Sequence, residues 1–414
     1  MAYLGPTSTM KEIMGVPEAV AVIDKYMPGF SPYFDPKSAM SGMSLQRILA
    51  SYPPEIGTAF LKEIEVIRSD KLHGGQIMAK ALKKEGVEKV FTLSGDHTMA
   101  MYYGLVEEGI EVVDFRHESS VIQAAMGYSR ASGKPAVCIV TAGPGASNAI
   151  GAMVDAWVEG IPVFLISGGH PYSANQTGAM QEIDQIPLFR GITKWADRVY
   201  DTNRIADYVH IGFRHMMNPN NRGPVFLEIP FDVINDVADA RCAYHCGSTR
   251  VDCAQYGDPV QVERAAELLA NAKKPVLVVG RESIYYPNNK EYVTKLCDYL
   301  MMPVAAMFEA KGFVGNEHNN PHYQLGLMAT AFADVIILLN VTPDYMFNCL
   351  SSPAYNPFAK FICINTNPNL VGMNRDFEVG IVGTPGEICK QIYDKLVTLR
   401  DRQTDPAFLQ EVGA

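Results

Sequence analysis

Glu118 is a carboxylate that stands where ionisation is unfavourable, at the junction between a strand that we expect to be buried and an apolar helix. The strand is predicted over 111–115, and the helix continues through Val121 and Met126 until Gly133 ends it. A carboxyl group at such a junction must find a partner or keep its proton. From these residues alone two interpretations remain open. Glu118 is either a functional carboxylate or an ordinary acidic residue in the first turn of a helix.

His97 is a second candidate because it follows a strand predicted over 88–93. Open α/β sheets bind ligands at the carboxyl ends of their strands. An imidazole that titrates near neutrality is suited to moving a proton to or from a hydroxyl group. The alternative is a polar residue in the first turn of the next helix. For its neighbour Asp96 we expect only a helix cap.

Six segments in register between residues 114 and 230 resemble the pyrimidine-binding domain of thiamine-diphosphate enzymes. They are the segment 114–133, which begins Asp-Phe-Arg-His-Glu, Thr-Ala-Gly-Pro-Gly-Ala-Ser-Asn-Ala at 141–149, Gly-Ile-Pro-Val-Phe-Leu-Ile-Ser-Gly at 160–168, Met-Gln-Glu-Ile-Asp-Gln at 180–185, Ile-Thr-Lys-Trp-Ala at 192–196 and Arg-Gly-Pro-Val-Phe-Leu-Glu-Ile-Pro at 222–230. The segments at 180–196 resemble the group formed by benzaldehyde lyase, acetohydroxyacid synthase and 2-hydroxyacyl-CoA lyase in particular.

The resemblance implies roles for three side chains. Glu118 falls on the family's glutamate, which hydrogen-bonds a ring nitrogen of the cofactor's aminopyrimidine. His97 matches an active-site histidine of benzaldehyde lyase. Gln181 matches a glutamine that faces the substrate and relays protons with that glutamate. A surface amide remains the alternative for Gln181.

The turn Gly143-Pro144-Gly145 is not a dinucleotide fingerprint, because the Gly-x-Gly-x-x-Gly spacing is missing. The resemblance implies that these glycines let the backbone approach the flat pyrimidine, with Asn148 on the helix behind. A tight turn alone would also need glycine, and both interpretations can hold.

Two stretches of alternating strands and helices predict an α/β fold with two doubly wound, mostly parallel-sheet domains. We expect an irregular N-terminal extension (1–65), a thiamine-diphosphate pyrimidine-binding domain (66–235), a linker (236–258), a Rossmann-like central domain (259–398) and a polar tail (399–414). One of the predicted helices spans 146–158. The extension has no assigned chemistry and is expected to pack on a partner.

Composition excludes several classes of function. A net charge of −10 argues against nucleic acid and anionic membranes as main partners. The apolar runs are no longer than a strand and are too short to span a bilayer, and the first residues show no signal-peptide pattern. We therefore expect a cytoplasmic protein with reduced thiols. Cys242, Cys246 and Cys253, with His245 between them, fit no standard zinc spacing, and we expect no metal ligands in this chain.

Enzymes of this family bind the cofactor's diphosphate through Mg²⁺ on a domain marked by Gly-Asp-Gly and a later Asn. These 414 residues contain no Gly-Asp-Gly. We therefore expect thiamine diphosphate and Mg²⁺ as cofactors, with the metal ligands on a second subunit. Two copies of each chain would form a heterotetramer.

Gly280 and Arg281 follow a predicted strand over 275–279 in the second domain. Some relatives hold ADP, coenzyme A or FAD at this place, and an arginine there could bind a phosphate. A solvated surface arginine is the alternative.

The sequence thus favours one subunit of a split thiamine-diphosphate-dependent lyase or carboligase. Such an enzyme makes or cleaves a carbon–carbon bond beside a carbonyl in 2-hydroxy ketones, 2-keto acids or 2-hydroxyacyl-CoA. The alternative is a non-catalytic binding or regulatory subunit that kept the fold. A nicotinamide dehydrogenase is disfavoured because neither domain carries the glycine fingerprint.

Overall fold

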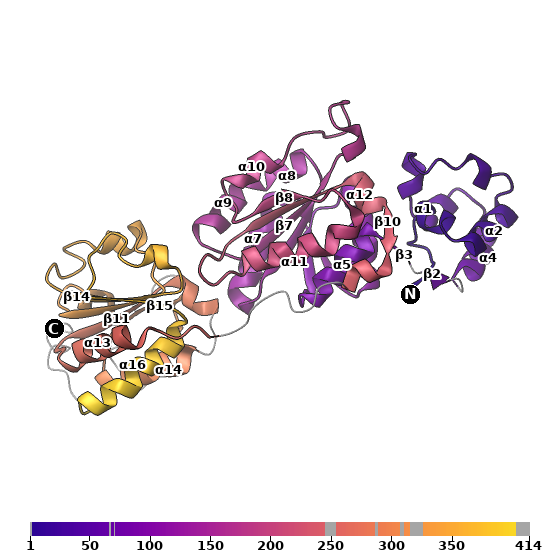
Figure 1. Ribbon diagram of the computed structural model, residues 1–414. Helices are drawn as coiled ribbons and strands as arrows, with labels where there is room; N and C mark the ends of the chain where they lie inside the picture. Colours follow the sequence, from indigo (N-terminus) through magenta and orange to yellow (C-terminus); the bar gives the residue numbers. More distant parts are fainter. Residues whose placement is uncertain are drawn as a thin grey trace. The chain divides into compact units, whose positions relative to one another are not determined.

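The computed structural model describes residues 2–65, 68–69, 71–244, 254–285, 289–306, 310–314 and 326–402. The chain divides into two compact units, one made of residues 1–218 and 222–251 and the other of residues 219–221 and 252–414. Each unit has its own parallel sheet and its own hydrophobic cores (Figure 1). Within the described residues, no helix combines the length and the hydrophobicity that crossing a membrane requires.

The sheet of the first unit has the strand order β5-β4-β6-β7-β9-β8, and its described pairings are all parallel. The strands are β4 (Lys89–Thr92), β5 (Glu111–Asp114), β6 (Ala136–Val140), β7 (Val163–Gly169), β8 (Ala196–Arg198) and β9 (Val225–Pro230). Strands β6, β7 and β9 are buried along their whole length, because helices cover both faces of the sheet. Neighbouring side chains point to opposite faces, so Ile139 joins one core and Cys138 the other.

Helices cover both faces of this sheet (Figure 1). One face carries α5 (Gly74–Lys84), α6 (Met99–Glu107) and α11 (Ile205–Met216), and the other carries α7 (Glu118–Ser132), α8 (Pro144–Asn148), α9 (Ile150–Val158) and α10 (Ile186–Arg190). The single helix predicted over 146–158 is wrong in detail. It begins earlier, at Pro144, because proline suits the first helical position, and it divides at Ala149 into α8 and α9.

The second unit contains a parallel sheet with the order β12-β11-β13-β14-β15. Its described strands are β11 (Pro275–Val279), β12 (Val304–Ala306), β13 (Val335–Leu339), β14 (Lys360–Asn365) and β15 (Val379–Val382). Its described helices are α13 (Pro259–Ala270), α14 (Asn289–Leu300), α15 (Gly326–Ala329) and α16 (Pro385–Leu399). Separate cores lie on the two faces of the sheet. The two units together confirm the predicted α/β fold class.

The N-terminal extension is irregular, as predicted, in that short helices alternate with turns. It contains β1 (Ala2–Tyr3), α1 (Met10–Met14), α2 (Pro17–Tyr26), α3 (Leu45–Leu49) and α4 (Pro54–Ile64) around a small core, and β1 pairs with β2 (Arg68–Ser69). The extension contacts the α/β part of its own unit through a 2.5 Å ion pair between Lys11 and Asp236. Asp236 lies between α12 (Phe231–Asn235) and β10 (Val237–Asp239), which pairs with β3 (Lys71–His73).

Glu12 in α1 is fully buried, and only Ser8 and Thr9 partly offset the cost of its charge. Burial, with a smaller contribution from the carboxylate of Glu107, raises the pKa of Glu12 from 4.5 to about 8. Between these two values the folded chain binds more protons than the unfolded chain, so stability falls as pH rises through this range. Replacing Glu12 by Gln should therefore raise the free energy of unfolding above pH 8 by up to about 5 kcal/mol.

Urea unfolding of the wild type and of Glu12→Gln below pH 5 and above pH 8 measures this difference. The variant should show little of the wild type's loss of stability at high pH. Glu18→Gln, which changes an exposed glutamate in the first turn of α2, is the matched control. An equal pH dependence in Glu12→Gln and the wild type would contradict the prediction.

Candidate active site

Glu118 is the first residue of α7 and lies at the carboxyl edge of the first sheet, directly after the loop that leaves β5. Its side chain is buried, with 8% of the residue exposed. Oε2 accepts a hydrogen bond of 3.0 Å from Nδ2 of Asn148 at the end of α8. Among the residues that the structure describes, Asn148 is the only one that donates to this carboxyl group. Oε1 is therefore available to a donor or acceptor on a ligand.

The glycine turn after β6 passes directly beside this carboxyl group. Gly143 has a φ of +59°, and a Cβ there would lie 2.7 Å from the carbonyl oxygen of Gln181. A Cβ on Gly145 would lie 2.7 Å from Cγ2 of Thr141 and 3.5 Å from Oε1 of Glu118. Both glycines are thus required by close packing. The turn thus passes next to Oε1 of Glu118, and α8 begins directly after it at Pro144.

His97 lies in a turn of 3₁₀ helix, Asp96–Thr98, between β4 and α6. It is buried, and its Nδ1 lies 3.1 Å from Oγ1 of Thr141. Because β4 and β6 are neighbours in the sheet, Thr141 reaches both His97 and Gly145. Thr141 therefore connects the histidine to the turn beside Glu118, and the backbone of Met180 also lies next to the imidazole.

Burial lowers the pKa of His97 from its ordinary value of 6.5, and the neighbouring His170 acts in the same direction. The carboxylate of Asp96 and the backbone of Met180 oppose this shift. The imidazole is therefore mainly neutral at pH 7, which is the form that accepts a proton. The helix cap expected of Asp96 is wrong. Asp96 lies inside the 3₁₀ turn, and neither that turn nor α6 has a side-chain cap.

Gln181 lies in the loop between β7 and α10, with a φ of +57° and an exposed side chain. Its backbone packs against Gly143, while its neighbour Met180 lies beside His97. Its side chain makes no hydrogen bond to any residue that the structure describes. The backbone of Gln181 thus lies against the glycine turn. The predicted role of its side chain toward the substrate stays a prediction.

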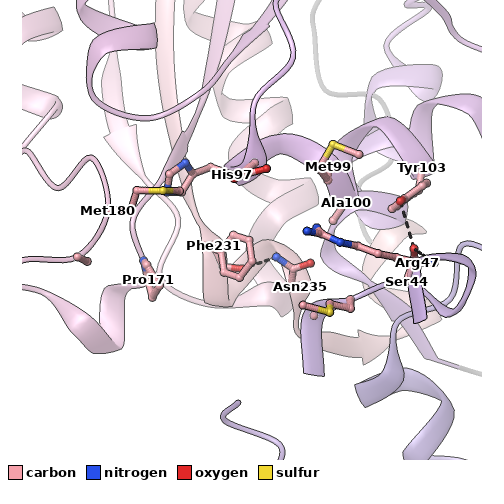
Figure 2. Close-up of a pocket in the computed structure, with 14 residues that line it drawn as sticks. Ser44, Arg47, His97, Met99, Ala100, Tyr103, Pro171, Met180, Phe231 and Asn235 are labelled. Atoms are coloured by element: carbon pink, nitrogen blue, oxygen red, sulfur yellow. Dashed lines mark hydrogen bonds between the residues drawn. The ribbon is translucent and has the colours of Figure 1, made fainter. Parts of the chain in front are cut away.

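A cavity of about 340 Å³ opens beside His97 (Figure 2). Phe231 and Asn235 of α12 form one wall, and Arg47 of the N-terminal extension lies at another. The ring of Phe231 meets the imidazole edge to face at 6.1 Å. None of these three residues was a sequence candidate, because nothing in their local pattern distinguishes them from ordinary helix residues. Thr141 was missed too, although it opens the glycine-turn segment.

The two candidate residues of the central domain, Gly280 and Arg281, make close contacts within their own unit. The guanidinium of Arg281 donates to Asp344 at 2.8 Å, and 13% of its side chain is exposed, so the solvated alternative is wrong. A Cβ on Gly280 would lie 1.9 Å from the carbonyl oxygen of Asn340, which requires glycine there. Nucleotide binding at this edge stays a prediction.

The cysteine-rich linker lies largely outside the described residues. His245, Cys246 and Cys253 are not described, and Cys242 is a buried free thiol. Elsewhere in the described chain, no group of three or more His, Cys, Asp or Glu side chains is arranged to hold a metal ion.

Comparison with known families gives two matches in chain order. The model of the thiamine pyrophosphate enzyme N-terminal TPP binding domain matches residues 72–188, and that of the central domain of the same enzymes matches residues 262–392. These ranges include Glu118, His97 and Gln181 in the first domain and Gly280 and Arg281 in the second.

Curated relatives have matching descriptions. A probable acetolactate synthase large subunit from Methanocaldococcus jannaschii is 28% identical over 353 residues, covering 80% of this chain and 58% of the relative. The corresponding protein from Methanococcus aeolicus is 30% identical over 338 residues, covering 78% and 55%. The 2-hydroxyacyl-CoA lyase 2 of Bos taurus is 28% identical over 337 residues, covering 73% and 53%. The chain spans about half the length of the curated relatives it matches.

Proposed function

The chain belongs to the thiamine pyrophosphate enzymes and has their N-terminal TPP-binding and central domains, and we propose that it is a subunit of a lyase or carboligase. The enzyme would make or cleave a carbon–carbon bond next to a carbonyl. The observation that carries this proposal is the buried carboxyl group of Glu118, whose Oε1 lies next to the glycine turn at Gly145. Relatives described as acetolactate synthases and 2-hydroxyacyl-CoA lyases support the reaction class.

The residues fit the pyrimidine half of thiamine diphosphate. When bound, this cofactor supplies the electron sink that carbon–carbon cleavage beside a carbonyl requires. Glu118 would hold a proton between Oε1 and a ring nitrogen, while Asn148 orients the carboxyl group through Oε2. The backbone of Gly143 and Gly145 would lie against the ring. Neither position has room for a Cβ, because Gln181 and Thr141 pack against these glycines.

His97 is proposed to move the proton of the substrate. Thr141 holds Nδ1, so Nε2 is the atom that would take a proton from a hydroxyl group, or return one to it. The lowered pKa keeps this nitrogen unprotonated and ready to accept. Gln181, whose backbone lies on the glycine turn, is proposed to relay protons between substrate and Glu118. We propose 2-hydroxy ketones, 2-keto acids or 2-hydroxyacyl-CoA as substrates.

The second half of the cofactor site is proposed to come from another polypeptide. In the family that the sequence resembles, the pyrimidine-binding domain faces a diphosphate-binding domain of a different chain. We propose that this partner carries Gly-Asp-Gly and binds Mg²⁺, and that two copies of each chain form a heterotetramer. For the central domain we propose a nucleotide-containing ligand, ADP, coenzyme A or FAD, at Gly280 and Arg281. Arg281 would then share its guanidinium with Asp344.

Mixing experiments test the proposed assembly. The purified chain alone should bind thiamine diphosphate weakly and show no turnover of pyruvate or of a 2-hydroxyacyl-CoA. Adding the partner with Mg²⁺ and cofactor should start turnover and shift the mass to that of a heterotetramer, measured by light scattering. Tight cofactor binding and turnover by the chain alone would contradict the two-subunit proposal. A stable complex that turns over neither substrate would favour a non-catalytic subunit instead.

A further inference from the structure

The cavity beside His97 is lined by residues of four segments that lie far apart in the sequence, 42–47, 96–103, 171–180 and 231–235. Gly42, Met43, Ser44 and Arg47 of the N-terminal extension form part of the lining, and the other lining residues come from the α/β part of the same unit. Gly42 packs so closely on α12 that a Cβ there would lie 2.9 Å from Cβ of Asn235. Oγ of Ser44 donates to the hydroxyl of Tyr103 at 3.1 Å (Figure 2). The extension therefore completes this cavity.

The cavity surface is mainly apolar. Met43, Met99, Ala100, Met180 and Phe231 line it. Methionine side chains adjust to the shape of an apolar ligand, and an aromatic face adds contact area. A volume of about 340 Å³ lies at the lower end of the range for small-molecule sites. The cavity thus suits a short apolar chain and is too small to enclose all of coenzyme A.

Arg47 is the charged group that distinguishes this cavity from a purely apolar one. Its guanidinium points toward Asn235 and Phe231, and His97 lies beyond them (Figure 2). The structure shows no hydrogen bond or ion pair of this guanidinium with any described residue, and none with Asp96, the acidic residue in the cavity lining. Arginine binds carboxylates and phosphates through paired N–H groups. The cavity thus has a basic group at one side and a proton-transfer group at the other.

We propose that the N-terminal extension makes this cavity a site for an anionic substrate, with Arg47 as the residue that binds the anionic group. The apolar chain of the substrate lies against Met99 and Phe231, and its carbonyl end faces His97. Asp96, beside His97, repels the anionic group and so favours this orientation over the reverse. That the bound anion is a substrate rests on the proposed function. The cavity volume favours a carboxylate over a nucleotide phosphate.

Binding measurements on the full chain test the proposal without catalysis. Hexanoate and hexanamide have the same length and shape and differ in charge, and butyl phosphate offers the other anion. Calorimetric titration should show hexanoate binding roughly tenfold more tightly than hexanamide. The ratio is modest because Arg47 is exposed and solvent screens its charge. Chemical shifts of labelled methionine methyl groups should place the ligand at Met99. If the chain binds butyl phosphate more tightly than hexanoate and this preference depends on Arg47, the site binds a phosphate and not the proposed carboxylate.

Variants isolate the contribution of the guanidinium. Arg47→Gln should abolish the preference for the anion, and Arg47→Lys should keep part of it. Arg214→Gln, which changes an exposed arginine on α11 outside the cavity, should leave the preference intact. Equal binding of hexanoate and hexanamide to the wild type would overturn the proposal. So would absence of saturable binding, or an anion preference that survives in Arg47→Gln.

The two proposals fail separately. Glu118→Gln should stop turnover in the assembled enzyme while leaving the hexanoate preference of the chain unchanged. If turnover does not depend on Glu118 but the Arg47-dependent preference persists, the proposed function is wrong and the anion site stands. If turnover depends on Glu118 but Arg47→Gln leaves the KM of anionic substrates unchanged, the anion site is wrong.

Discussion

Replacing Glu118 by Gln should abolish turnover in the assembled enzyme while leaving the fold of this chain intact. The amide has nearly the shape of the carboxyl group and can keep its contact with Asn148. It cannot exchange a proton with a ring nitrogen of the cofactor, because an amide neither gives up nor accepts a proton at neutral pH. Steady-state rates with saturating thiamine diphosphate and Mg²⁺, together with circular dichroism of the variant, provide the measurement.

Glu111→Gln is the matched control, because Glu111 is an exposed carboxylate on β5 that pairs with Lys89. This control should keep wild-type rates. Titration of thiamine diphosphate into the assembled Glu118→Gln enzyme should show weakened binding, since one polar contact to the pyrimidine has changed. Wild-type rates in Glu118→Gln would remove the cofactor assignment of this carboxyl group.

Replacing His97 by Ala should slow turnover by roughly 10²- to 10⁴-fold, which is the usual contribution of one general acid–base group. Cofactor binding should change little, because Thr141 lies between His97 and the glycine turn. The pH profile gives a second readout. The neutral imidazole is the active form and burial lowers its pKa, so wild-type kcat/KM should fall only below pH 6.5. This acid limb should disappear in the variant.

His215→Ala is the control for this prediction. His215 lies on α11, stacked on Trp195, and does not line the cavity. It should retain both the rate and the acid limb. If His97→Ala also retains them, His97 is a residue of the helix start and another group moves the proton.

The sequence by itself determined the two parallel sheets and the position of Glu118. Strands such as β6 and β7 are buried on both faces and therefore appear as unbroken apolar runs. Glu118 stands out because it is a carboxylate at the start of an apolar helix. The strand before it, β5, lies at the edge of the sheet and is only half-buried, so the buried strand expected there is wrong. The glycines at 143 and 145 are visible for the same local reason, since only a turn or a close approach requires them.

Only the tertiary structure decided which distant groups meet. Thr141 reaches His97 because the strand order places β6 beside β4, and no local pattern states that order. The pairing of Arg281 with Asp344 likewise depends on the adjacency of β11 and β13. Arg47 lies on a short helix with an ordinary pattern, and it reaches the cavity because the extension packs on α12 through Gly42. Hydrophobic periodicity is a local property of the sequence. A site depends on contacts between segments that are far apart in the chain, and no periodic pattern indicates which of these segments meet.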